Sequence, residues 1–391
     1  LIAIDNGFQS CILAPTEILA NQHFKSLSEL LIDYDVKVDL LTGSSKTRER
    51  NLIHSNLLSG KTNILVGTHA ILEDVVKFKN LGLSIIDEQH RFGVAQRAKL
   101  WKKNNPAPHI LVMTATPIPR TLAMSLYGDL DISYIKELPP GRITTKTVHK
   151  YDRNRLSVFK FLKDQINKGR QVYLVYPLIN ESEKLDYKDL MDGYESIVRE
   201  FPRPDFQVSI VHGKMKAKDK DYEMKRFINK ETQILVSTTV IEVGVNVPNA
   251  SVMVIESAER FGLSQLHQLR GRVGRGNDES YCVLMTKDKL SEDSKLRIET
   301  MVKVSDGFKL AEVDLKLRGP GDMLGTRQSG MLRFKLADIV YDTEILNNAR
   351  NSVIKLLKTD PRLNKNENLA IRDEISTSSN SKNLWLSLIH I

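Results

Sequence analysis

Two adjacent acids, Asp87 and Glu88, stand at the end of an apolar stretch that predicts a buried strand over residues 83–87. In open α/β sheets, ligands bind at the carboxyl ends of the strands. There the carboxylate of Asp87 could hold Mg²⁺ through water, and that of Glu88 could orient or deprotonate an attacking water. A bare Asp-Glu pair is also typical of a solvated strand end. Gln89 and His90, which follow directly, favour the catalytic interpretation.

The next apolar stretch, residues 110–114, ends in two threonines separated by one alanine. Thr114 and Thr116 would present their hydroxyl groups beside the edge that carries the two acids. There they could bond differently to the ATP-bound and ADP-bound states. Two prolines fix the backbone just after them. Taken alone, this short pattern is a weak signal and usually marks only the end of a strand.

Arginines recur three residues apart in the second half of the chain, where residues 265–276 are QLHQLRGRVGRG. The core of this stretch is Gln268, Gly271, Arg272 and Arg275. Arginines on one helical face can reach a γ-phosphate, and such a contact can raise a rate by ~10³–10⁵. The alternative is a basic helix that lies against solvent or DNA.

A fourth stretch, residues 238–248, follows a predicted strand and has the sequence TTVIEVGVNVP. Thr239, Glu242 and Gly244 could contact either a nucleotide or a DNA phosphate. A plain turn is the alternative interpretation of the same residues.

The elements that would position these residues form two series of short apolar strands alternating with helices, the pattern of parallel sheets with crossover helices. The predicted strands are residues 10–14, 36–41, 63–67, 83–87 and 110–114, then 171–176, 207–212, 232–237, 252–256 and 280–285. The predicted helices are residues 17–31, 47–58, 154–169, 216–229 and 291–305. A turn-rich break, LPPGR, separates the two series at residues 138–142. We therefore expect two similar sheets that face each other across a cleft.

The α/β pattern ends near residue 287, so we expect domains at residues 1–143, 144–287 and 288–391. Hydrophobic residues make up 41% and charged residues 27%, as in ordinary soluble proteins. No apolar run approaches the roughly 18 residues of a membrane helix, and we expect no signal peptide. Cys11 and Cys282 are predicted to be buried free thiols in a reducing cytoplasm. A net charge of +9 permits a polyanion partner without proving one.

The motif series resembles that of superfamily 2 helicases, in the same order along both halves. It comprises APTEILANQH at residues 14–23, VGTHAI at 66–71, DEQH at 87–90, TATPIPRTL, STTVIEVG and QLRGRVGR. Within that superfamily, DEQHRFGVAQR, YGDLDISYIKELPPGR and ESAERFGLSQLHQLRGRVGRG resemble the RecG family of bacterial fork-remodelling helicases. Residues 306–308 and 314–330 look like the element with which that family couples ATP turnover to movement along DNA.

The resemblance implies two tandem RecA-like parallel-sheet domains with a mostly helical or irregular extension. It also implies an ATP-dependent DNA helicase that acts on forked and branched DNA in repair and recombination, as a cytoplasmic monomer. Asp87 would hold Mg²⁺, Glu88 the water, and Arg272 and Arg275 the γ-phosphate. Other implied nucleotide contacts are Gln89, His90, Thr114, Thr116, Glu242, Gly244, Asn246, Gln268 and Gly271. The implied DNA contacts are Thr16, Thr68, His69, Thr239, Arg318, Arg327 and Gln328.

Two features depart from the family pattern. Asn246 stands where the family often has Asp, so we expect altered rather than lost contacts. The family's phosphate-binding loop should precede the strand at residues 10–14, but LIAIDNGFQS contains none. Gly60-Lys61-Thr62 resembles the end of such a loop, yet Ser55 stands where its first glycine is needed, and Gly60 is predicted to end a helix instead. The chain is therefore expected to be the carboxyl-terminal part of a longer helicase, without its loop and wedge domain, and inactive alone.

Two alternatives remain at this point. A transcription-repair coupling translocase shares the coupling element, although its acidic box and linker differ from DEQH and ELPPGR. A non-catalytic DNA-binding module is the other, because the lysine of the phosphate loop is missing.

Overall fold

The computed structural model describes residues 1–88, 92, 94–115, 131–135, 137, 143–177, 183–238, 247–276, 278–323 and 342–377. The chain forms two compact units. One comprises Leu1–Pro117 with Pro139–Gly307, and the other comprises Ile118–Leu138 with Phe308–Ile391. Both parallel sheets belong to the first unit.

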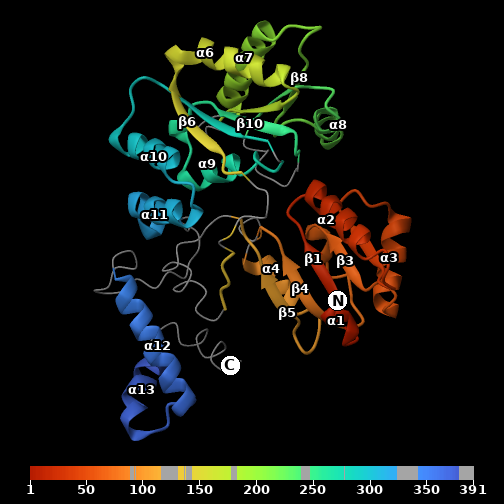
Figure 1. The fold of residues 1–391 in the computed structure, drawn as a ribbon. Helices are drawn as coiled ribbons and strands as arrows, with labels where there is room; N and C mark the ends of the chain where they lie inside the picture. The colour runs from red at the N-terminus through yellow and green to blue at the C-terminus, as the bar shows by residue number, and fades with distance from the viewer. Residues whose placement is uncertain are drawn as a thin grey trace. The chain divides into compact units, whose positions relative to one another are not determined.

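The first sheet has five parallel strands in the order β2-β3-β1-β4-β5 (Figure 1). These strands are β1 (Gln9–Leu13), β2 (Val38–Leu41), β3 (Ile64–Gly67), β4 (Leu81–Ile86) and β5 (His109–Val112). The helices of this part are α1 (Ile2–Asp5), α2 (Glu17–Leu30), α3 (Thr47–Ser59), the short η1 (His69–Leu72) and α4 (Val94–Trp101). Each of the five strands predicted from sequence is present, with ends shifted by one or two residues.

Local signals explain where two of these helices begin and end. The hydroxyl of Thr16 accepts a hydrogen bond from the backbone N–H of Leu19 and so caps α2. Helix α3 ends at Gly60, whose φ of 80° lies in the left-handed region. The N–H of Lys61 then bonds the carbonyl of Asn56 at 2.9 Å. The prediction that Gly60 ends a helix is therefore confirmed.

Apolar side chains cover both faces of this sheet. On one face, α2 packs Leu19 and Ala20 against Ile64 and Val66. On the other face, α3, η1 and α4 contribute to a larger cluster around Leu13. Its other members include Cys11, Leu41, Ile53, Leu57, Leu65, Ala70, Ile71, Leu81, Ile86 and Leu100. Strands covered on both faces explain why the sequence shows continuous apolar runs rather than alternation.

The second sheet has six parallel strands in the order β6-β11-β10-β7-β9-β8. They are β6 (Lys146–Tyr151), β7 (Gln171–Val175), β8 (Val208–Val211), β9 (Ile234–Ser237), β10 (Ala250–Ile255) and β11 (Tyr281–Thr286). Its helices are α6 (Arg155–Asn167), α7 (Glu183–Glu200), α8 (Ala217–Ile228) and α9 (Leu263–Arg270), with short turns η3 (Asp152–Asn154) and η5 (Ala258–Arg260). Strand β6 was not predicted from the sequence.

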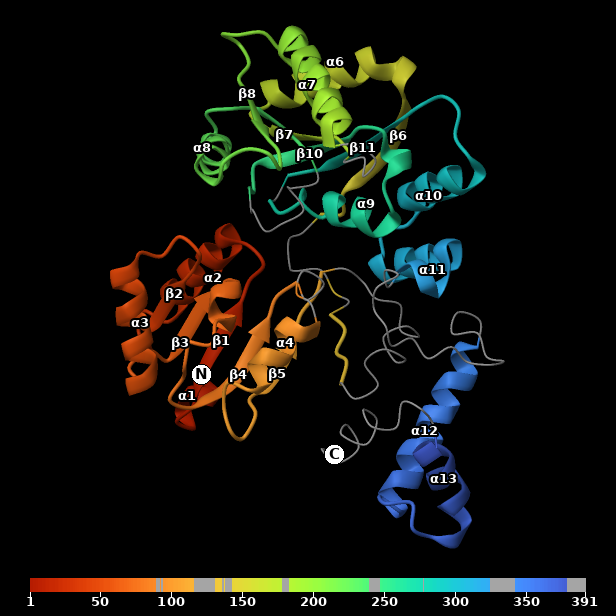
Figure 2. The same cartoon turned by 180° about the vertical axis from the view of Figure 1, so that it is seen from behind.

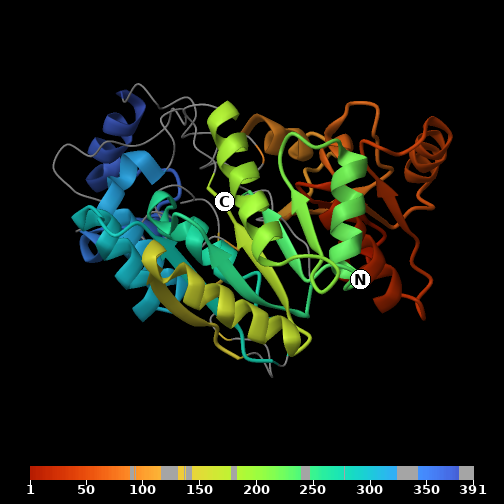
Figure 3. The same cartoon turned by 90° about the horizontal axis from the view of Figure 1, so that it is seen from above.

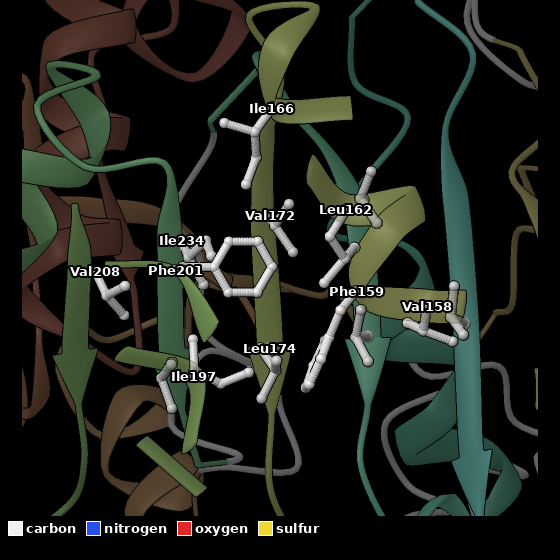
Figure 4. Packing of buried hydrophobic residues seen from close by; sticks show 14 of the residues in the cluster. Val158, Phe159, Leu162, Ile166, Val172, Leu174, Ile197, Phe201, Val208 and Ile234 are labelled. Atoms are coloured by element: carbon white, nitrogen blue, oxygen red, sulfur yellow. The ribbon is translucent and has the colours of Figure 1, made fainter. Parts of the chain in front are cut away.

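Helices α6 and α7 cover one face of the second sheet, and α8 and α9 cover the other (Figures 1 and 2). Figure 3 shows α6 and α7 from above, lying over the strands. Side chains of α6 and α7 meet Val172 and Leu174 of β7 in one buried cluster, shown in Figure 4. On the opposite face, the ring of Tyr173 lies 5.1 Å from that of Phe227 on α8.

The two sheets are copies of one arrangement. Written from the opposite edge, the second sheet has the order β8-β9-β7-β10-β11-β6, so its first five strands match β2-β3-β1-β4-β5 both in space and along the chain. The sequence repeats too, because residues 62–68 are TNILVGT and residues 232–238 are TQILVST. This repeat makes Asp87 at the end of β4 the counterpart of Glu256 at the end of β10.

A buried glutamine occupies the same place in each copy. The side-chain amide of Gln9 donates to the carbonyls of Leu57 and Thr62, at 3.1 and 2.7 Å. That of Gln171 donates to the carbonyls of Phe227 and Thr232, at 2.6 and 2.7 Å. Each glutamine thus ties the first residue of a central strand to the end of a helix and to the approach to the next strand.

Helices make up the described part of the chain after the second sheet. They are α10 (Glu292–Lys303), α11 (Gly307–Met323), α12 (Thr343–Thr359), η6 (Asn366–Asn368) and α13 (Leu369–Thr377). No helix among the described residues is long and apolar enough to cross a membrane. The predicted fold class, two tandem parallel-sheet domains with a helical extension, is confirmed. The exact domain boundaries stay predictions.

The two cysteines are buried free thiols, as predicted. Burial raises the pKa of Cys11 to about 11 and that of Cys282 to about 12. Both side chains therefore stay protonated and act as small apolar groups in the core.

Candidate functional site

The carboxyl edge of the first sheet carries six of the predicted site residues. Thr16 follows β1, Thr68 and His69 follow β3, and Asp87 and Glu88 follow β4. Thr114 stands two residues beyond β5. Because all five strands are parallel, their carboxyl ends meet at one edge of the sheet, where a ligand can be contacted from several loops at once.

Asp87 is held in place through its backbone and its side chain. Its N–H bonds the carbonyl of Leu13 at 2.9 Å, which extends the ladder between β4 and β1 by one residue. Its Oδ2 lies 2.9 Å from Nε2 of His23, which is on α2. An ionised carboxylate only accepts hydrogen bonds, so Nε2 of His23 is the donor. The side chain of Asp87 keeps 19% of its surface exposed, which leaves it reachable by a ligand.

Glu88 has an unusual backbone and a defined contact. Its φ of 51° lies in the left-handed region, which non-glycine residues seldom adopt. Its Oε2 accepts a hydrogen bond from the N–H of Ala115 at 3.3 Å. Ala115 lies between the two predicted nucleotide-contacting threonines. The structure thus brings the acid pair and the segment after β5 together, as the sequence predicted.

The oxygen atoms at this edge suit Mg²⁺ but do not form a complete cage. Among the residues that the structure describes, no group of three or more His, Cys, Asp or Glu side chains could hold a metal. Mg²⁺ is usually bound through one or two carboxylates together with waters and substrate phosphates. The carboxylate of Asp87, with Glu88 beside it, fits that mode of binding.

The arginine segment lies at the end of α9. Arg272 is buried with 7% of its surface exposed, whereas Arg275 is exposed. Both guanidinium groups lie close enough to the hydroxyl of Tyr173 to lower its pKa, which burial raises more strongly. The predicted pair therefore gathers on one side of the second sheet, beside β7. Gln268 is half-buried on α9, and Gly271 is the residue that ends this helix.

A third arginine fixes this segment to the next helix. Arg270 is buried and donates hydrogen bonds to the carbonyls of Met301, Val304 and Ser305 at 2.9–3.0 Å. These carbonyls lie at and just after the end of α10, where a helix carries partial negative charge. Burial lowers the pKa of Arg270. This anchor was not predicted from the sequence.

The predicted DNA-contacting residues differ in exposure. Thr16 uses its hydroxyl as the cap of α2. Thr68 is only 2% exposed, and its hydroxyl has no hydrogen-bond partner among the described residues. His69 is exposed at the start of η1. Arg318 belongs to α11, but its side chain lies outside the described part.

Nine predicted site residues fall outside the described residues. They are Gln89, His90, Thr116, Thr239, Glu242, Gly244, Asn246, Arg327 and Gln328. Their roles, like those of all the site residues, stay predictions.

Sequence reasoning missed two side chains that contact the acids of the two copies. His23 contacts Asp87 in the first copy, and Arg155 contacts Glu256 in the second. His23 is 64 residues from Asp87 along the chain, so no local pattern could have indicated that pair. The internal repeat was the available signal for Glu256, because aligning the two copies places it opposite Asp87.

Three family models match successive parts of the chain. A model described as DEAD/DEAH box helicase matches residues 1–125, and one described as helicase conserved C-terminal domain matches residues 157–277. A third, described as ATP-dependent DNA helicase RecG, domain 3, C-terminal, matches residues 304–388.

Curated relatives named ATP-dependent DNA helicase RecG resemble nearly the whole chain. The relative from Synechocystis is 50% identical over 95% of this chain and 44% of its own length. The relative from Aquifex aeolicus is 50% identical over 94% and 47%, and that from Bacillus subtilis is 48% identical over 96% and 55%. The chain thus spans about half the length of the curated relatives it matches.

Two solved structures of helicases are similar to this chain. A structure of RecG bound to a three-way DNA junction matches with a TM-score of 0.70 and 43% identity, over 87% of this chain and 44% of that one. The helicase MrfA bound to DNA and AMPPNP matches with a TM-score of 0.58 at 17% identity, over 80% of this chain and 49% of that one, which supports the fold alone.

Family models described as DEAD/DEAH box helicase and as helicase conserved C-terminal domain match residues of both parallel sheets, so the chain falls in the DEAD/DEAH box class of helicases. The third family model and the curated relatives narrow this class. The chain belongs to the RecG family of ATP-dependent DNA helicases.

Proposed function

We propose that this protein hydrolyses ATP to move along DNA, and that it remodels stalled replication forks and branch-migrates recombination junctions. The observation that carries the proposal is the acid pair. Asp87 and Glu88 stand at the carboxyl edge of a parallel sheet, and Glu88 reaches the segment that follows the neighbouring strand. The motif order and the RecG relatives support DNA as the substrate.

In this proposal each acid has one task. Asp87 holds Mg²⁺ on the nucleotide, and the ion, when bound, neutralises charge on the phosphates. Glu88 accepts a proton from the water that attacks the γ-phosphorus, while the bond from that phosphorus to the bridging oxygen of ADP breaks. Arg272 and Arg275 stabilise the charge that spreads over the γ-phosphate oxygens. Release of phosphate then permits the next step along DNA.

A phosphate-binding loop is not among the described residues, and the free edge of β5 offers a place for one. In the second sheet, β6 pairs with β11, the counterpart of β5. In the first sheet, β5 has no partner on that side among the described residues, and Leu111 is half exposed. A further strand paired there would place the loop that follows it beside Asp87. We propose that the complete nucleotide site includes such a strand.

The substitution Glu88→Gln tests this proposal in the whole gene product. It keeps the shape and the hydrogen bond of the side chain but removes the base. We expect DNA-stimulated ATP hydrolysis to fall by ~10²–10⁴, with the dissociation constant for a three-way DNA junction unchanged. Glu29→Gln, the same change at an exposed glutamate of α2, is the matched control with near-normal turnover. Equal turnover in Glu88→Gln and the parent protein would refute the role of Glu88 as the base. No ATP hydrolysis by a parent protein that binds the junction would favour a DNA-binding module that does not use ATP.

A further inference from the structure

The equivalent acids of the two copies of the fold, Asp87 and Glu256, have different side-chain partners. Asp87 follows β4 and Glu256 follows β10, which are the same strand of the repeat. Each acid is followed directly by a residue with the same rare left-handed backbone, Glu88 with a φ of 51° and Ser257 with a φ of 46°. The two acids therefore occupy matching positions, and their side-chain partners can be compared directly.

In the second copy the acid is fully neutralised. Arg155, the first residue of α6, donates to both carboxylate oxygens of Glu256, at 2.6 and 2.9 Å. Glu256 is 4% exposed. An arginine always carries its charge, so this ion pair leaves neither a free oxygen nor a net negative charge for a metal ion.

In the first copy one oxygen of Asp87 accepts a hydrogen bond, and the other oxygen can still bind a metal ion. His23 donates a hydrogen bond to Oδ2 of Asp87 from the second helical turn of α2. No hydrogen bond from another described residue reaches Oδ1. A single donor on one oxygen orients the carboxylate and leaves the other oxygen available to a metal ion.

We propose that His23 is a positioning residue for Asp87, fixing one carboxylate oxygen so that the other points to Mg²⁺ on the nucleotide. The inference rests on the proposed function and deepens it. It assigns a role to a helix residue outside the acid pair, and it explains why the first copy can use its acid whereas the second cannot. The deciding difference is geometric: His23 bonds one carboxylate oxygen of Asp87, whereas Arg155 bonds both oxygens of Glu256.

Three substitutions at His23 test the proposal in the whole gene product. His23→Gln keeps an N–H donor at similar reach, His23→Leu removes the donor, and His23→Arg reproduces the kind of pairing seen in the second copy. Asn21→Ala is the matched control, because Asn21 lies on the same helix and is exposed, and its side chain bonds the carbonyl of Glu17 rather than an acid of the site. Thermal unfolding of every variant checks that the fold is kept.

The measured quantity is the Mg²⁺ concentration at half-maximal binding of the fluorescent nucleotide mant-AMPPNP. Loss of a group that orients a metal ligand typically costs 10–100-fold in metal affinity. We therefore expect His23→Leu to raise this concentration by roughly 10-fold or more, and His23→Arg to raise it further. His23→Gln and Asn21→Ala should stay close to the parent protein.

Two results would overturn the inference. One refutes only the role of His23, and the other refutes the proposed function. If His23→Leu lowers the unfolding temperature but leaves the Mg²⁺ concentration unchanged, His23 only stabilises the fold. If the parent protein shows no Mg²⁺-dependent binding of the nucleotide, the proposed function itself fails and the role of His23 fails with it.

Discussion

The left-handed backbone of Glu88 shows how one residue can serve both the fold and the chemistry. Such a conformation costs of order 1–3 kcal/mol and persists only where the surroundings hold it. Ser257, which has the same conformation in the second copy, is not a predicted site residue. The strain therefore belongs to the repeated fold, and in the first copy it directs an acid toward the segment after β5.

A substitution at Lys61 tests whether residues 60–62 bind phosphate. Gly60, Lys61 and Thr62 resemble the end of such a loop, but they close α3 through hydrogen bonds to Asn56. Because Lys61 is exposed and far from the acid pair along the sheet, we expect Lys61→Ala to leave DNA-stimulated ATP hydrolysis within about twofold of the parent protein. A loss comparable to the ~10²–10⁴ expected for removal of a catalytic base would mean that these residues do bind phosphate.

At the scale of elements, the buried glutamines hold each copy together. Replacing Gln171 by Leu removes the donor that the carbonyls of Phe227 and Thr232 use. An unsatisfied buried polar group costs about 1–3 kcal/mol, so we expect the free energy of opening near β7 to fall by about 2–4 kcal/mol. Hydrogen exchange at the β7 amides measures this change. Lys160→Leu, at an exposed lysine of α6, should change stability by less than about 0.5 kcal/mol.

The stability of the turn between α12 and α13 should fall at low pH. Asp360 accepts hydrogen bonds from the side chain of Asn368 and from the N–H groups of Lys365 and Asn364, and these bonds lower its pKa. They stabilise the turn when the pH is above the pKa of an unfolded Asp, about 4, and are lost as the pH falls through the lower folded value.

The variant Asp360→Asn isolates this effect. At neutral pH, hydrogen exchange in the turn should be slower in the parent protein than in Asp360→Asn, because the charged acceptor is stronger. The difference should shrink as the pH falls below about 4. A difference that stays constant down to pH 3 would show that the charge of Asp360 does not stabilise the turn.

How much could be predicted from the sequence depended on burial. Ten strands were predicted to within two residues because they form short apolar runs. Most of these runs are buried, and β5 is partly exposed but still contains the apolar run Ile-Leu-Val. Strand β6 was missed because it is an edge strand, KTVHKY, in which every second residue is exposed. The acid pair and the arginines could be proposed from the sequence because each set lies within one short segment. His23 and Arg270 could not, since only the folded chain brings their partners to them.

At the scale of the whole molecule, charge provides a test of DNA binding. The net charge is +9, and contacts to phosphates release counterions, so affinity falls as salt rises. We expect the dissociation constant for a three-way DNA junction to rise by at least about 10²-fold between 50 and 200 mM salt. Fluorescence anisotropy with a labelled junction measures it. A constant that does not change with salt would argue against binding through the DNA backbone.

The measurement that tests the central claim most directly is the rate of ATP hydrolysis by the whole gene product, with and without three-way junction DNA. If the acid pair and the arginine segment serve a DNA motor, the rate should rise by at least about tenfold when the junction is added, and Mg²⁺ should be required. The same rate with and without DNA, in a protein that binds the junction, would contradict the account.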